Sequence, residues 1–163
     1  MHNHFPVADR LEKFKIHWPE AYTTLSPSIL RIHRLHDYFH NNVEQLVKHY
    51  DLQAADFGVL ETLRREPAPY CLSPTELYQS MLFSSGGLTK VLNRLTGAGL
   101  IRREDNPLDK RSKLVLLNEQ GLRIIEVVTE ELHQLEHKNM ARLSATEKQQ
   151  LDRLLSKLLQ EWE

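Results

Sequence analysis

Apolar residues recur every three or four positions over much of this chain, and this spacing predicts amphipathic helices. A long helix is expected over residues 26–50, because the pair Ser26-Pro27 suits a helix start. A second helix is expected over residues 53–65. The first 25 residues have no clean period, although Trp18-Pro19 predicts an ordered bend. The apolar positions of the long helix are Ile29, Ile32, Leu35, Phe39, Val43, Leu46 and Tyr50.

Two shorter helices and a hairpin are expected next. Ser73 and Glu76 form a capping box, in which each side chain satisfies an amide of the first helical turn. The following helix is expected to begin at Ser84 and to end at Gly97, with an apolar stripe on one side. Two short helices joined by a tight turn are typical of a helix-turn-helix. The runs "LIRRE" and "KLVLLN" then pair as strands around "DNPLDKRS", and a hairpin in this place is a wing.

Two further helices close the chain, over about residues 119–142 and 145–162. Asn118 caps the first, and Ser144 with Glu147 forms a capping box for the second. The last helix carries an apolar seam wider than one helix can hide, which predicts a partner subunit. The seam consists of Leu151, Leu154, Leu155, Leu158 and Leu159.

The predicted fold is therefore mostly α-helical with a small β-hairpin wing, in one domain of residues 1–163. Residues 53–118 form the winged helix-turn-helix core, and residues 1–50 and 119–163 flank it as dimerisation helices. The residues expected at the dimer contact are Ile29 and Ile32 of the first long helix and Leu151, Leu154, Leu155 and Leu158 of the last.

Composition places the chain among ordinary globular proteins. Apolar residues make up 40% and charged residues 26%, which argues against disordered and membrane classes. No apolar run is long enough to span a membrane, and the N-terminus lacks the order of a signal peptide. Cys71 is the only cysteine, so an internal disulfide is impossible. We expect a cytoplasmic protein with no cofactor.

Positive charge is concentrated in one part of the sequence. The formal net charge of the chain is −1, but residues 84–113 contain seven basic residues against three acidic ones. This asymmetry predicts a phosphate-binding face on an acidic body. The chain has no phosphate-binding glycine loop, no nucleophile elbow and no compact carboxylate group, so an enzyme is not expected.

The segment "LSPTELYQSMLFSSGGLTKVLNRLTGAGLIRREDNPLDKRSKLVLLNEQG" resembles the winged helix-turn-helix core of the MarR family of regulators. The most specific features are Asp109-x-Arg111 before an apolar strand and an Asn-x-x-Gly helix start. The resemblance implies a two-fold dimer on double-stranded DNA with a pseudo-palindromic site. It also implies a recognition helix in the major groove and a wing arginine near the minor groove.

The candidate DNA-binding residues lie on the recognition helix and the wing. Alternatives stay open for three of them: Ser84 can act only as a cap, Arg94 can pair with an acidic side chain, and Arg111 can be a solvated charge. Asp109 is expected to orient Arg111. The full set is Ser84, Ser85, Gly86, Thr89, Lys90, Arg94, Lys110, Arg111 and Lys113.

A small-molecule effector is also implied by the resemblance. The segments "HWPEAYTTLSP" and "LRREPAPYCLSPTEL" are most similar to the urate-responsive branch of the family, where a tryptophan, an aspartate and an arginine serve the ligand. Trp18 matches the tryptophan, whereas the alignment puts Gly58 and Val91 at the other two positions. This favours a small aromatic or apolar effector over a urate-like anion. Plain packing is the alternative role of Trp18.

Histidine pairs and the cysteine complete the candidates. His36 with His40, near His33, and His133 with His137 are each one helical turn apart, a spacing that can chelate zinc. Because the signal is weak, no metal site is predicted. We expect Cys71 to be an inert thiol, since no neighbour in sequence favours its thiolate.

Together these observations predict a homodimeric, sequence-specific DNA-binding regulator of transcription, which we expect to be a ligand-responsive repressor. The alternative is a winged-helix module that binds an acidic protein partner without specific DNA binding.

Overall fold

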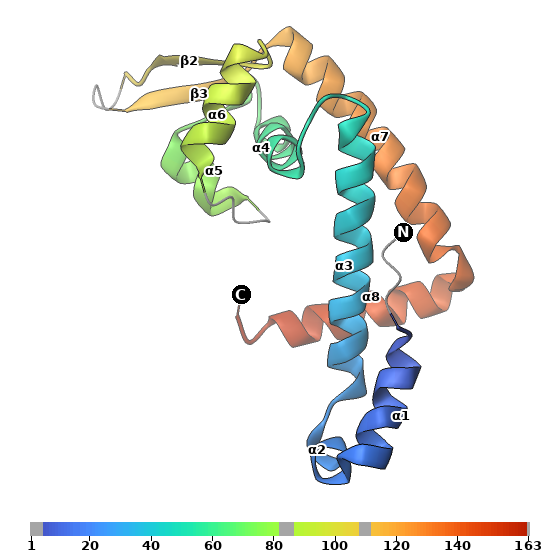
Figure 1. Ribbon diagram of the computed structural model, residues 1–163. Helices are drawn as coiled ribbons and strands as arrows, with labels where there is room; N and C mark the ends of the chain where they lie inside the picture. The colour runs from blue at the N-terminus through green and yellow to red at the C-terminus, as the bar shows by residue number, and fades with distance from the viewer. Residues whose placement is uncertain (1–4, 82–86, 108–111, 163) are drawn as a thin grey trace.

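A winged lobe and a helical arm make up the protein (Figure 1). The computed structural model describes residues 5–81, 87–107 and 112–162. The arm contains α1, α2, α3, α7 and α8, and the lobe contains α4, α5, α6 and the strands. The elements are α1 Val7–His17, α2 Pro19–Thr24, α3 Pro27–Lys48, α4 Ala54–Arg65, β1 Cys71–Leu72, α5 Pro74–Ser80, α6 Leu88–Gly97, β2 Ile101–Asp105, β3 Lys113–Leu117, α7 Glu119–Asn139, a 3-10 turn Met140–Arg142 and α8 Ala145–Leu159.

The predicted fold class is confirmed, with one correction at the N-terminus. Residues 7–24, where the sequence shows no clean period, form α1 and α2. Neither helix has a fully buried residue, so neither needs a strong apolar stripe. Trp18 separates the two helices with a non-helical backbone conformation (φ −150°, ψ 64°), and Pro19 begins α2. The expected bend at Trp18-Pro19 is therefore confirmed.

The capping boxes fix where two helices begin. The Ser73 hydroxyl accepts a hydrogen bond from the Glu76 amide, and the Glu76 carboxylate accepts one from the Ser73 amide. These bonds hold the pKa of Glu76 below its ordinary value. Ser144 and Glu147 form the same pair of bonds at the start of α8. Both predicted capping boxes are confirmed.

The wing is a three-stranded antiparallel sheet in the order β1-β3-β2. The predicted hairpin of β2 and β3 is present, with Ile101 opposite Leu117. The strand β1, which pairs Cys71 and Leu72 with Leu116 and Val115, is not among the strands predicted from the sequence. A strand of two residues is too short to show the alternation that identifies strands in a sequence.

The core lies in the winged lobe. Leu60 and Leu63 of α4 are fully buried, and α5, α6, the wing and α7 pack around them. Gly121 in the first turn of α7 sits so close to the wing that an added Cβ would lie 2.0 Å from the carbonyl oxygen of Leu100. Only glycine allows this approach, which fixes α7 against the lobe.

The arm has much less buried surface. The helix α8 has no fully buried residue, and several large apolar side chains of α3 and α8 are exposed. None of the described helices is long and apolar enough to cross a membrane. The exposed apolar residues of these two helices include Ile29, Ile32, Leu35, Phe39, Leu154, Leu155, Leu158 and Leu159.

Candidate nucleic-acid interface

The helix α6 has one buried face and one exposed face. Val91, Leu92 and Leu95 point into the core, whereas Thr89 and Lys90 are exposed. Asn93 is also exposed. The predicted division of this helix into an apolar stripe and a polar face is therefore confirmed.

The beginning of α6 differs from the prediction. The helix begins at Leu88 and not at Ser84, because Gly87 has a left-handed φ of 96° that ends the helical path on its N-terminal side. Ser84, Ser85 and Gly86, which were expected to lie in its first turn, are outside the described residues. Their proposed DNA contacts stay predictions.

The wing strands present three exposed basic side chains. Arg102 forms an ion pair of 2.7 Å with Glu104, and Lys113 is paired with Asp105. Arg103 instead donates a hydrogen bond of 2.9 Å to the Asn93 side-chain oxygen. This bond joins β2 to the exposed face of α6. The wing-tip residues Asp109, Lys110 and Arg111 are outside the described residues.

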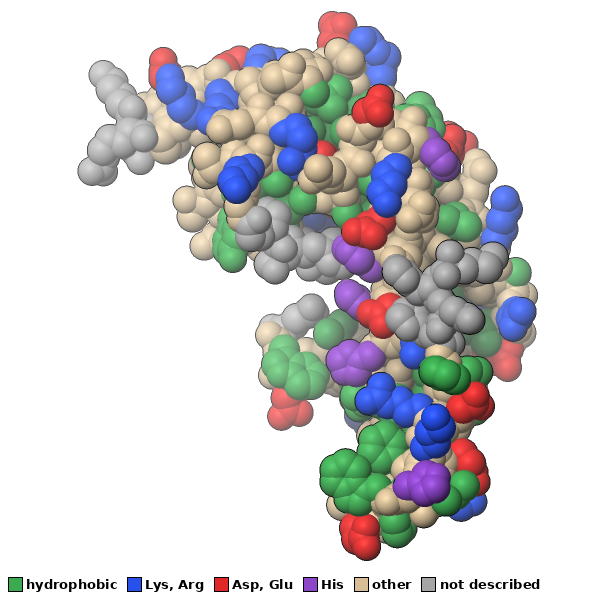
Figure 2. All heavy atoms as spheres, in the orientation of Figure 1, with side chains coloured by type: hydrophobic (Ala, Val, Ile, Leu, Met, Phe, Trp, Pro, Cys, Tyr) green, Lys and Arg blue, Asp and Glu red, His purple; other side chains and the backbone are tan. Residues whose placement is uncertain are grey.

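These partners change how the local charge is distributed. In the described part of the lobe, Arg102 and Lys113 are compensated by neighbouring carboxylates, and Lys90 has no ion pair. Arg103 has a neutral partner and keeps its charge uncompensated. Lys and Arg side chains are visible over the lobe in Figure 2. Lys90 and Arg103 are therefore the described cations best suited to meet phosphate or base edges.

Arg94 pairs with an acidic side chain, Asp56, which is the alternative to DNA contact that the sequence left open for it. Its guanidinium Nε lies 3.0 Å from both carboxylate oxygens of Asp56, and the second nitrogen lies 2.7 Å from one of them. The Asp56 side chain is only 2% exposed, against 37% for Arg94. Asp56 also accepts the Gln53 amide at the start of α4. Arg94 therefore holds α6 on α4.

This ion pair bears on the effector. The alignment placed Gly58 and Val91 at the aspartate and arginine positions of the urate-responsive regulators. Asp56 of α4 lies two residues before Gly58, and Arg94 of α6 lies three residues after Val91. The structure brings Asp56 and Arg94 together as an ion pair. These two side chains satisfy each other, and the Asp56 side chain is only 2% exposed. The aromatic or apolar effector expected from the sequence therefore stays a prediction.

Trp18 lies at the other end of the protein from this pair. Trp18 is 59% exposed, and its ring stacks on Phe14 with 6.0 Å between ring centroids. Arg10, Lys13 and His17 complete a shallow surface pocket around these two rings. In Figure 1, α1 and α2 lie at the end of α3 away from α4. Trp18 is therefore not a core residue, but its stacking on Phe14 fits plain packing of the N-terminal helix, so both roles of Trp18 stay open.

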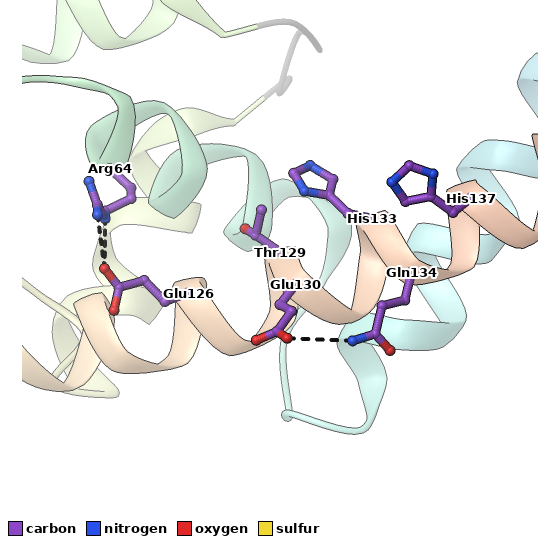
Figure 3. Close-up of a pocket in the computed structure, with 7 residues that line it drawn as sticks. All are labelled: Arg64, Glu126, Thr129, Glu130, His133, Gln134 and His137. Carbon is purple, nitrogen blue, oxygen red and sulfur yellow. Dashed lines mark hydrogen bonds and ion pairs between the residues drawn. The ribbon is translucent and has the colours of Figure 1, made fainter. Parts of the chain in front are cut away.

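A second shallow pocket lies on α7 and contains one of the predicted histidine pairs (Figure 3). His133 and His137 point to the same side of α7, while Glu126 is paired with Arg64 at 2.9 Å. Glu130 accepts a hydrogen bond from Gln134. Among the residues that the structure describes, no three His, Cys, Asp or Glu side chains are arranged to hold a metal ion.

Cys71 lies in β1 and is partly buried. Burial raises the pKa of its thiol, and the nearby carboxylates of Glu104 and Glu76 raise it further. A raised pKa lowers the fraction of reactive thiolate at neutral pH. This direction agrees with the expected inert thiol.

The order of α5, α6 and the wing defines a winged helix-turn-helix protein. A model of the MarR family matches residues 50–112. The regulator PecS of Dickeya dadantii (strain 3937) is 34% identical over 116 residues, which cover 71% of this chain and 70% of PecS. The multiple antibiotic resistance protein MarR of Escherichia coli (strain K12) is 35% identical over 139 residues, covering 80% and 92% of the two chains. The chain belongs to the MarR family, a family of transcriptional regulators and not of enzymes.

A solved structure supports the same relationship. The crystal structure of a mutant E. coli MarR complexed with operator DNA matches with a TM-score of 0.67 and 34% sequence identity. The match covers 82% of this chain and 94% of that chain. The family resemblance seen in the sequence is therefore confirmed in three dimensions.

We predict that Arg94→Ala destabilises the fold much more than Arg102→Ala. Removal of Arg94 leaves the buried Asp56 carboxylate without its counter-charge, which costs about 3 kcal/mol of unfolding free energy. Arg102 forms an exposed pair with Glu104, and its loss costs less than about 1 kcal/mol. Guanidinium denaturation at one protein concentration measures both values. Equal losses would show that the Arg94–Asp56 pair has no special structural role.

Proposed function

We propose that this chain is a homodimeric transcriptional repressor that binds a pseudo-palindromic operator through α6 and the wing. One observation carries the proposal: the exposed face of α6 and the basic strand β2 form one surface, joined by the Arg103–Asn93 hydrogen bond. Membership of the MarR family and the likeness to the E. coli operator complex support it.

In this proposal α6 enters the major groove. Its exposed residues Thr89, Lys90 and Asn93 meet base edges, while Val91 and Leu95 keep the helix seated in the lobe. A lysine in this position donates to the acceptors of guanine. The wing then follows the neighbouring backbone and minor groove, where the tip arginine Arg111 of the sequence prediction supplies a cation.

An interaction module without specific DNA binding is the rival function. Several cations of the winged lobe have acidic neighbours, so the surface is less basic than the sequence count indicates. A repressor loses affinity for duplex DNA steeply as salt rises, because bound cations replace counterions on the phosphates. An interaction module has little DNA affinity even at low salt.

We predict that Lys90→Ala weakens operator binding and also narrows the discrimination between operator and base-substituted DNA, by about 1 kcal/mol per half-site. Titration of labelled duplexes at several salt concentrations measures affinity, base preference and salt slope together. Lys138→Ala is the matched control, because Lys138 is an exposed lysine in the last turn of α7. If both variants bind like the unmodified protein, the proposed DNA face is wrong and the interaction module becomes the better interpretation.

Dimerisation is proposed through the arm. Leu154 and Leu158 of α8 are one helical turn apart and both exposed, and Leu155 extends the same seam, while Leu151 is half-buried. Ile29 and Ile32 expose a similar surface on α3. A second copy of the chain that covers this surface places two recognition helices about one DNA turn, ~34 Å, apart.

We predict that Leu154→Glu combined with Leu158→Glu converts the dimer to a monomer. Two carboxylates cannot be buried in an apolar contact without a large desolvation cost, yet both positions are exposed in a single chain. The control is Gln149→Glu combined with Ser156→Glu, which adds the same charge to the polar side of α8. Sedimentation equilibrium distinguishes the two. A leucine variant that stays dimeric would place the interface elsewhere.

The effector is proposed to be a small planar aromatic anion that contacts Trp18. The exposed ring of Trp18, already stacked on Phe14, offers an aromatic surface, and the neighbouring Arg10 and Lys13 supply positive charge. Such a ligand changes DNA affinity only if it prefers one arrangement of the dimer over another.

We predict that an aromatic carboxylate such as benzoate raises the melting temperature of the protein and that Trp18→Ala removes this shift. A ligand that binds only the folded state stabilises it by mass action. Trp162→Ala, at the other tryptophan, is expected to keep the shift, because Trp162 lies beyond the end of α8. Operator affinity without ligand is expected to stay close to normal in Trp18→Ala. A loss of operator binding in that variant would assign Trp18 a structural role instead.

A further inference from the structure

One face of α3 carries a row of possible metal ligands that the proposed regulator function does not use. His33, His36, His40 and Glu44 follow one another at spacings of three, four and four residues. Residues at these spacings lie on the same side of a helix. Figure 2 shows histidine side chains gathered along the middle of the molecule, over α3.

His36 and His40 are already arranged as a pair. Their rings are parallel to within 3°, and the ring centroids are 5.9 Å apart. Both side chains are exposed, at 62% and 44%. A metal ion can therefore reach the ring nitrogens from solvent. Because the lone pair of an imidazole nitrogen lies in the ring plane, rotation of these exposed side chains directs one nitrogen of each toward the same ion without any rearrangement of the core.

A carboxylate lies beside each imidazole. The Asp37 oxygen is 3.6 Å from Nδ1 of His36, and the Glu44 oxygen is 3.7 Å from Nε2 of His40. Metal-binding histidines commonly donate their second ring N–H to a carboxylate, which orients the ring and makes the other nitrogen a better ligand. Asp37 and Glu44 are placed to act in this way.

We propose that His36 and His40 chelate a divalent transition metal ion, of which Zn²⁺ is the test case, at an open surface site. Imidazole nitrogen is a favoured ligand of Zn²⁺, and two histidines four residues apart on a helix can bind the same ion. Water completes the coordination, because the described residues offer no third ligand in position. This site is independent of the proposed DNA binding, since neither α6 nor the wing contributes to it.

The second histidine pair of the chain serves as an internal comparison. His133 and His137 have the same spacing on α7, but in the described structure no carboxylate lies within ion-pair distance of either ring. The nearby Glu126 is paired with Arg64, and Glu130 accepts a hydrogen bond from Gln134 (Figure 3). The α7 pair therefore lacks the carboxylate partners of the α3 pair and is not expected to bind as tightly.

The test is a Zn²⁺ titration of the full chain in competition with a chromophoric chelator. We expect one Zn²⁺ per chain, and at least a tenfold loss of affinity in His36→Ala combined with His40→Ala. The matched control, His133→Ala combined with His137→Ala, is expected to bind within twofold of the unmodified protein. Circular dichroism and the melting temperature show whether each variant is folded. We expect both variants to fold, because all four histidine side chains are exposed.

A further variant separates the proposed site from a chance histidine pair. Glu44→Gln keeps the side-chain shape but removes the charge beside His40, and a loss of about tenfold in Zn²⁺ affinity is expected. Three results overturn the proposal: no Zn²⁺ bound by the unmodified protein at micromolar concentration, unchanged affinity after loss of His36 and His40, or an equal loss in the α7 control variant.

Discussion

The arrangement of the winged lobe depends on one buried charge. The Asp56 carboxylate lies at the start of α4, out of contact with water, and such a group is tolerated only when hydrogen bonds and a counter-charge satisfy it. Arg94 of α6 supplies both. The ion pair adds directional hydrogen bonds to the apolar packing of α6 in the core, and so helps to fix how α6 is presented.

The same interaction lies between the two parts of the protein. Asp56 is close to the point where the chain passes from α3 of the arm to α4 of the lobe. The carboxylate is held by the amide of Gln53, which caps α4, and by Arg94 of α6. Few residues therefore separate the end of α3 from the contact that holds α6. In the proposed dimer, this pair is a short physical connection between the arm and the helix proposed to read DNA.

Much of the fold could be predicted from the sequence, because helix caps and apolar spacing are local signals. The capping boxes at Ser73 and Ser144 predicted both helix starts, and the periodicity gave α3, α4 and α7 within a few residues. The partners of charged residues could not be predicted. Arg94 and Asp56 are 38 residues apart, and no local pattern shows that they meet. The strand β1 was missed because it exists only through its pairing with β3.

The hydrogen bond between Arg103 and Asn93 has a consequence for how operators can vary. It joins the wing strand β2 to the middle of α6, and so couples the positions of the two parts in the proposed complex with DNA. An operator whose minor groove is unusually wide or narrow would displace the wing. Because the wing is joined to α6, this would also shift α6 relative to the base edges in the major groove. In the proposed complex, bases that the protein never touches therefore influence its affinity, through the width they impose on the groove beside them.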